Sequence, residues 1–424
     1  MDAPSATVTP REDADAGWMN VLVAGALFGS ILYQAVLCLV HTKIHPVTPT
    51  LFAAAELVIY AACVPVALRR LPAGMVLVVS IIAANMCLLA LLRGGPDFKA
   101  VRDLAIPILF LWAGINAGSM RYADRILGWM VAVVVAVGVF EWLFLDLYTE
   151  YFNIYSYYVS LGRLVESTEY VNESRLQLNG TRPEEIGRTI LPMIFGSHRV
   201  SSVFLEPVSL GNFSVIVAAW GLSKGHDERR TGGLFFAAAC LLIALADSRY
   251  GLVTVALLLV LRFMVRGPEH ALAFTFPFIA IAINVGGALF MPDSSGDNFL
   301  GRLVWAGKSL LEFSAGLVVG WEAPTNFYGD MGYAYVISRF GILLCLFMWF
   351  CFCFIRMADE RGLRYRAYLS LYLSLILCVS GQSLFALKTA GLIWFLLGCC
   401  MARTEARPQQ AAMPFTYGRA WQAH

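Results

Sequence analysis

Charged residues able to do chemistry gather where long apolar stretches of this chain begin or end. Charge near the hydrocarbon core of a bilayer is costly, so its position is informative. The arginine side chain stays charged and offers a fixed fork of donors that matches phosphate oxygens. The pattern therefore predicts a pocket for an anionic, membrane-embedded substrate such as a lipid-linked diphosphate. The residues concerned are Arg199, Glu206, Asp247, Arg249, Arg302 and Asp330.

Two of the carboxylates are candidates for a general base. Asp330 and Glu206 each border the start of an apolar stretch in the same layer. The alternatives are helix N-capping by Asp330 and an ion pair between Glu206 and Arg199. For the arginines, the alternative is a role as snorkelling anchors or ion-pair partners.

Histidine and metal chemistry are less strongly indicated. His198 adjoins one of the arginines and is a further candidate for catalysis or substrate contact. The acidic pairs Glu184-Glu185 and Asp293 with Asp297 are a weaker option for a divalent metal. Because no cluster with the ligand types and spacing of a metal site lies near the arginines, we expect a site with no metal and no other cofactor.

Composition indicates which elements must position these residues. Hydrophobic residues make up 59% of the 424 residues and charged residues only 14%, whereas about a quarter of an average soluble domain is charged. We therefore predict one all-α, polytopic membrane domain over residues 1–424 with about 12 transmembrane helices. The predicted spans cover residues 18–40, 50–68, 73–92, 103–119, 124–145, 207–223, 231–247, 250–265, 270–291, 332–356, 367–386 and 389–402.

Two long polar segments interrupt the spans. The first covers residues 146–206, and the second covers residues 292–331 and contains a short amphipathic helix at 301–313. Its pattern places the apolar Leu303, Val304, Leu310 and Leu311 on one side and Arg302, Trp305, Ser309 and Glu312 on the other. Outside these segments, Lys and Arg concentrate in the loops on the side of the N-terminus, which predicts that both termini are cytoplasmic. Both long segments, and the site at their ends, then face outward, while residues 403–424 form a cytoplasmic tail.

Four motifs in order resemble the bacterial O-antigen polymerase and ligase superfamily over roughly residues 195–345. The first runs from Arg199 through Glu206-Pro to Asn212, and the second is the turn Ser248-Arg249-Tyr250-Gly251. The third is Gly301-Arg302-x-x-Trp305, and the fourth is Asp330-x-Gly-Tyr333 followed by Phe-Gly341.

The resemblance implies a GT-C-like membrane glycosyltransferase of the bacterial inner membrane, with its active site facing the periplasm. It assigns diphosphate binding to Arg249 and Arg302 with support from Arg199, and catalysis to Asp330 or Glu206. Trp305, Tyr333 and His198 become substrate-binding candidates. Ligases of the superfamily carry a histidine near the position of Asp330, and its absence here favours a polymerase of the exopolysaccharide or capsule type.

The implied partners are an undecaprenyl-diphosphate-linked glycan donor and acceptor, the lipid bilayer, and a copolymerase that regulates chain length. No nucleic-acid partner is expected. Two alternatives stay open at this stage, an O-antigen ligase and a transporter or flippase of lipid-linked oligosaccharide. Against the transporter, few ionisable groups fall inside the spans, chiefly Glu56, Glu141 and Arg339, so no ion relay is evident.

Overall fold

The computed structural model describes residues 10–164, 175–176, 180–181, 187–264, 270–294 and 299–402. In these residues the chain is helical, with an isolated extended bridge between Thr181 and His198. The all-α architecture is therefore confirmed for the described residues. The predicted tail at 403–424 and the pair Glu184-Glu185 lie outside the described residues, as does Asp297.

The helices follow one another with short connections, apart from the two long segments. In chain order they are α1 (Pro10–Lys43), α2 (Pro49–Leu68), α3 (Ala73–Leu92), α4 (Phe98–Ala117), α5 (Met120–Leu143), α6 (Leu145–Tyr151), α7 (Ile154–Ser160), α9 (Pro192–Phe195), the 3₁₀ turn η2 (Ser202–Phe204), α10 (Pro207–Ser223), α11 (Arg229–Ala246), α12 (Arg249–Met264), α13 (His270–Phe290), α14 (Phe299–Leu311), α15 (Ala315–Val319), α16 (Gly332–Phe354), α17 (Glu360–Ile376), α18 (Gln382–Phe385) and α19 (Leu387–Met401).

Seven helices in the described part of the chain are long and apolar enough to cross a membrane. They lie in α1, α2, α3, α5, α11, α13 and α16. The other predicted spans fall on α4, on the shorter α10, α12 and α19, and on α17 with α18, so the total of about 12 spans stays a prediction. The bounds 367–386 are wrong, because α17 begins at Glu360, ends at Ile376 and is followed by a turn before α18.

Local sequence explains where several helices begin. Side chains of Thr48, Asp97 and Ser119 accept a hydrogen bond from the backbone two or three residues into α2, α4 and α5. Such N-caps satisfy amide groups that have no partner within the helix. Proline opens α2 and α10, where its missing amide hydrogen costs nothing.

Helix α16 is broken at Gly341, whose φ of 73° is a left-handed conformation that glycine adopts readily. Arg93, just after α3, donates to the carbonyl oxygens of Ser338 and Arg339 at 2.8 and 3.0 Å. It also donates to the Gly320 carbonyl at 2.7 Å. One guanidinium therefore satisfies carbonyl groups beside the break and ties α15 to α16.

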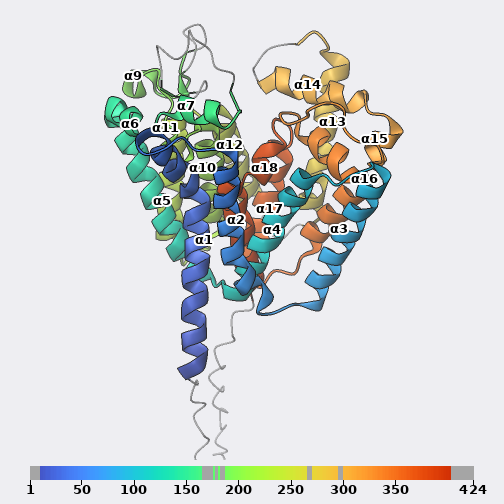
Figure 1. Ribbon diagram of the computed structural model, residues 1–424, viewed down its shortest axis with the longest axis horizontal. Coiled ribbons are helices and arrows are strands. Elements are labelled where there is room, and N and C mark those ends of the chain that lie inside the picture. Colours follow the sequence, from blue (N-terminus) through green and yellow to red (C-terminus); the bar gives the residue numbers. More distant parts are fainter. Residues whose placement is uncertain are drawn as a thin grey trace, which may run out of the picture.

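The two long segments lie at the same end of the molecule (Figure 1). Helices α6, α7 and α9 of the first segment and α14 of the second stand opposite the N-terminal part of α1. We call this end the loop end. Because α5 leads into α6 and α10 follows η2, the first residues of α5 and the last of α10 lie at the other end, which we call the tail end.

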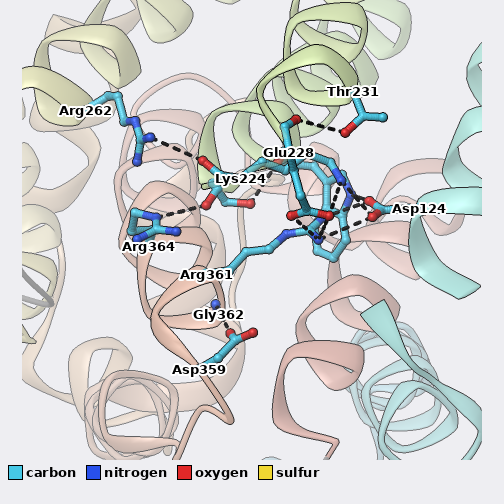
Figure 2. Close-up of polar contacts among 11 residues, drawn as sticks. Asp124, Lys224, Glu228, Thr231, Arg262, Asp359, Arg361, Gly362 and Arg364 are labelled. Carbon is cyan, nitrogen blue, oxygen red and sulfur yellow. Dashed lines mark hydrogen bonds and ion pairs between the residues drawn. The ribbon is translucent and has the colours of Figure 1, made fainter. Parts of the chain in front are cut away.

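An ion cluster closes the tail end, and Figure 2 shows its side chains converging. Asp124 accepts from Lys224 Nζ at 2.7 Å, from Arg361 Nη2 at 2.8 Å and from Trp220 Nε1 at 2.7 Å. Glu228 accepts from Lys224 at 3.3 Å and from Arg361 at 3.1 Å. We use the name tail cluster for Asp124, Lys224, Glu228 and Arg361, which join α5, the α10–α11 connection and α17.

Candidate functional site

The segment before α10 is fixed to α5 by one buried carboxylate. Glu141 accepts hydrogen bonds from the Ser201 amide and hydroxyl, each at 3.0 Å, and from the Ser202 amide at 2.5 Å. His198 Nε2 lies 3.0 Å from the same carboxylate. Glu141 is fully buried, and burial of a charge is costly unless it is hydrogen-bonded. These donors therefore offset the loss of its contacts with water. His198 is thus held as a partner of Glu141.

Arg199 and Arg188 are buried at the end of α11. Arg199 Nε donates to the Ala246 carbonyl at 3.1 Å. Arg188 donates to the Leu245 carbonyl at 2.9 Å and also to the carbonyls of Ala244 and His198. Cations that cap the last carbonyls of a helix stabilise its C-terminus. Arg199 therefore supports the α11–α12 turn, and sequence reasoning overlooked the same role for Arg188.

The α11–α12 turn itself presents Arg249. Asp247, with a φ of 47°, is buried and accepts from the amides of Thr189 and Ile190 at 3.0 and 2.9 Å. Arg249 is exposed, and its Nε donates to the Thr189 hydroxyl at 2.6 Å. Its two terminal nitrogens have no hydrogen-bond partner among the residues that the structure describes. The turn thus orients a guanidinium and leaves its fork open.

Glu206 joins a second buried network at the loop end. Lys388 Nζ lies 2.5 Å from one carboxylate oxygen, which also accepts from Ser209 at 2.7 Å. Tyr158 donates to the other oxygen at 3.2 Å. Burial alone would raise the pKa of Glu206, but the Lys388 ammonium and these hydrogen bonds hold that pKa below the ordinary glutamate value. The carboxylate partner is Lys388, a residue that sequence reasoning missed.

Lys388 also donates to Gln34 and to the Phe204 carbonyl, each at 3.3 Å. Its signal in the sequence is a lone lysine in the short break between two apolar stretches. A second missed cation is Arg163, whose guanidinium lies 4.5 Å from the centroid of the Phe52 ring and 6.0 Å from that of Tyr158. These contacts extend the network across α1, α7, α10 and α19.

The short helix expected at 301–313 forms as α14, and it packs on α13 through Leu303, Val304 and Ala306. Arg302 and Trp305 lie on its exposed face, as the amphipathic pattern predicted. The pattern was wrong for the last turn, where Leu311 is 51% exposed and Ser309 only 8%. Ser309 is buried because its hydroxyl contacts Met331 Sδ at 2.8 Å, just before α16.

Asp330 and Tyr333, at the entrance to α16, differ in their exposure. Asp330 is exposed, and α16 begins at Gly332 without a side-chain cap, so Asp330 does not act as an N-cap. Tyr333 is buried, donates from its hydroxyl to the Ser374 carbonyl at 3.0 Å and packs beside Leu303. Tyr333 therefore fixes the first turn of α16 to α17. Asp330, by contrast, is exposed and accessible to a ligand.

The predicted residues thus form two groups at one end of the molecule. His198, Arg199 and Arg249 surround the α11–α12 turn, while Arg302, Trp305 and Asp330 belong to α14 and the start of α16 (Figure 1). Arg249, Arg302, Trp305 and Asp330 are exposed. In the described part of the chain, no group of three or more His, Cys, Asp or Glu side chains converges in a way that would hold a metal ion.

Known proteins provide no relative with which to compare this arrangement. No protein-family model, no curated protein and no solved structure matches the chain. The chemical interpretation of the loop end therefore depends on the motifs in the sequence and on the geometry of the side chains described above.

Proposed function

We propose that this chain is a polysaccharide polymerase of the inner membrane. It would join undecaprenyl-diphosphate-linked oligosaccharide repeat units at the periplasmic face by glycosyl transfer that needs no metal. The observation that carries the proposal is the state of Arg249. The neighbouring Arg188 and Arg199 are buried in backbone contacts, while Arg249 is exposed with an open guanidinium fork. Such a fork matches a diphosphate.

The proposed reaction follows from the exposed groups. A hydroxyl of the acceptor sugar attacks the anomeric carbon of the lipid-linked donor, and the bond from that carbon to the diphosphate oxygen breaks. The electron pair stays on the departing diphosphate, whose charge Arg249 and Arg302 stabilise. Electrostatic stabilisation of this kind often contributes more to catalysis than any other effect. Trp305, exposed beside Arg302 on α14, offers an aromatic surface to the sugar.

Asp330 is the better choice for the base that accepts the hydroxyl proton. Glu206 already accepts from Lys388, Tyr158 and Ser209, and its lowered pKa makes it a weaker proton acceptor. Asp330 is exposed at the entrance to α16, in the same layer as Arg302. Glu206 then orders the start of α10.

Reconstituted protein supplied with defined lipid-linked repeat units tests the proposal. We expect chains of several repeats with the wild-type protein and none with Arg302→Ala, while the amount of folded protein in the membrane is unchanged. Asp330→Asn should reduce lengthening by about a hundredfold or more, the range typical for loss of a general base. Translocation without lengthening would identify a flippase, and transfer to a non-lipid-linked acceptor would identify a ligase.

A further inference from the structure

An apolar cavity of about 280 Å³ lies among helices α3, α4, α13, α16, α17, α18 and α19. Its lining includes Val78 and Ile82 of α3, Leu104 of α4 and Phe340 of α16. On one side the cavity is lined by α3, and only 11% of the apolar stretch of this helix is buried inside the protein. A cavity lined in this way attracts hydrocarbon and not water.

The cavity is long. Its lining begins with Tyr333 in the first turn of α16 and extends to Ile355, directly after the last turn. The lining therefore follows, past the break at Gly341, the whole of a helix that is long enough to cross a membrane, whose hydrocarbon core is about 30 Å thick. An ordinary phospholipid chain reaches only to the middle of that core. The length fits a long polyisoprenyl chain better than an acyl chain.

Cations gather where the cavity approaches the loop end. Lys99 Nζ lies 5.0 Å from the centroid of the Phe327 ring and 5.4 Å from that of Tyr335. The Arg339 guanidinium lies 4.8 Å from the same Tyr335 ring. Tyr335 packs against Phe385, which lines the cavity. The cationic groups are thus one aromatic ring away from the apolar lining.

Most of these cations already have carboxylate partners, but Lys99 does not. Arg339 pairs with Asp97, and Arg102 pairs with Asp103 at 2.9 Å and with Glu56 at 3.7 Å. No carboxylate of the described residues lies within 4.0 Å of Lys99. Its ammonium group is therefore not neutralised by a direct ion pair with any described residue.

We propose that the cavity holds part of the polyisoprenyl chain of a phosphate-linked lipid, with the rest in the bilayer, and that Lys99 binds its phosphate. This is a lipid site separate from the α11–α12 turn. Phe327 lies three residues before Asp330 in the loop that enters α16, so the acceptor's glycan, which carries the attacking hydroxyl, would extend from Lys99 toward the proposed base. A polymerase needs two lipid-linked substrates, and on the proposed function this site takes the acceptor.

Native mass spectrometry of the full-length protein with undecaprenyl phosphate tests the site. We expect two bound copies in the wild type, and one in Lys99→Gln with the affinity at the lost position reduced about tenfold or more. Arg249→Ala should lose the other copy. Val78→Trp, which fills the cavity, should act like Lys99→Gln.

Matched controls separate the site from general damage. Lys43→Gln removes a lysine that also contacts a tyrosine ring in this layer, Tyr151, but that pairs with Glu150. Leu77→Trp enlarges a residue of α3 that is 61% exposed and outside the cavity lining. Both should bind like the wild type. Equal competition by phosphatidylglycerol, or wild-type binding by Lys99→Gln and Val78→Trp, would overturn the proposal.

Binding is measured without turnover, so the two proposals fail separately. A protein that binds lipid in the predicted pattern but never lengthens chains retains the lipid site and refutes the polymerase. If the protein polymerises and Lys99→Gln and Val78→Trp lengthen chains at the wild-type rate, the lipid site has no part in acceptor binding.

Discussion

The tail cluster and the loop end use the same residue types in opposite ways. In the tail cluster, Arg361 contacts both Asp124 and Glu228, stacks on Trp220 at 4.4 Å and has Lys224 as a neighbour on the same carboxylates. At the loop end, Arg249 donates to one hydroxyl, and Lys99 has two aromatic rings beside it but no carboxylate in the described residues. Both cations of the tail cluster are thus paired with carboxylates, whereas these two loop-end cations have no such partner in the described residues.

The difference separates charges that hold the fold from charges that are available to a ligand. Removing one partner of a buried ion pair is strongly destabilising, because the other charge then stays behind unpaired. An exposed cation with one neutral partner costs little to remove. A charged position at a membrane boundary is therefore assigned to structure or to binding by its partners, and not by its residue type.

The largest effect on stability is expected for Arg361→Ala. The variant leaves Asp124 and Glu228 with Lys224 alone and removes the stacking on Trp220. We expect a loss of about 2–4 kcal/mol, below the full range for a broken buried pair because Lys224 remains. Thermal unfolding of the detergent-purified protein measures it. Arg364→Ala is the matched control, since Arg364 pairs with the exposed Glu360 and donates to the Ser223 carbonyl at 2.9 Å, and should cost about 1 kcal/mol.

An intermediate and pH-dependent effect is expected for Lys388→Met. In the wild type, the lowered pKa of Glu206 stabilises the folded protein at pH values above the ordinary glutamate pKa. This contribution is lost as the pH falls through the lowered pKa of the folded state. Without the ammonium group, burial dominates and raises that pKa. We expect a loss of about 1–3 kcal/mol at pH 7, since the carboxylate keeps 26% exposure, and a smaller difference from wild type near pH 4.

A double variant checks that the effect belongs to the pair. Lys388→Met with Glu206→Gln removes both charges, so it should recover part of the stability that Lys388→Met loses. Unfolding is followed across the same pH range in each protein. A difference from wild type that is the same at pH 4 and pH 7 would show that Glu206 is not the group responsible.

Hydropathy and spacing predicted the helices well but not their partners. The apolar runs place α1, α2, α3 and α16, and the amphipathic pattern places α14 and its exposed Arg302, because these signals are local. The Glu206–Lys388 pair joins residues 182 positions apart, and only the packing of α10 against α19 brings them together. His198 and Glu141 likewise meet only because the segment around η2 packs against α5.

Similar reasoning explains what was missed or misplaced in the candidate site. The sequence placed Arg199 and Arg249 in one layer, and nothing local distinguishes the buried one from the exposed one. That distinction depends on the end of α11, where the Ala246 carbonyl lies next to Arg199 and the Thr189 hydroxyl next to Arg249. Burial of Ser309 likewise depends on Met331, which lies beyond the amphipathic helix.

The smallest effect on stability is expected where the effect on the reaction is largest. Arg249→Ala removes one exposed hydrogen bond to Thr189, so the free energy of unfolding should change by less than about 0.5 kcal/mol. Chain lengthening should fall about a hundredfold or more, because the open fork no longer stabilises the departing diphosphate. Thr189→Val, which keeps the charge but removes the hydroxyl that orients it, should lose activity only in part. A destabilisation of Arg249→Ala as large as that of Arg361→Ala would mean that Arg249 holds the fold, and the contrast between the two ends would then fail.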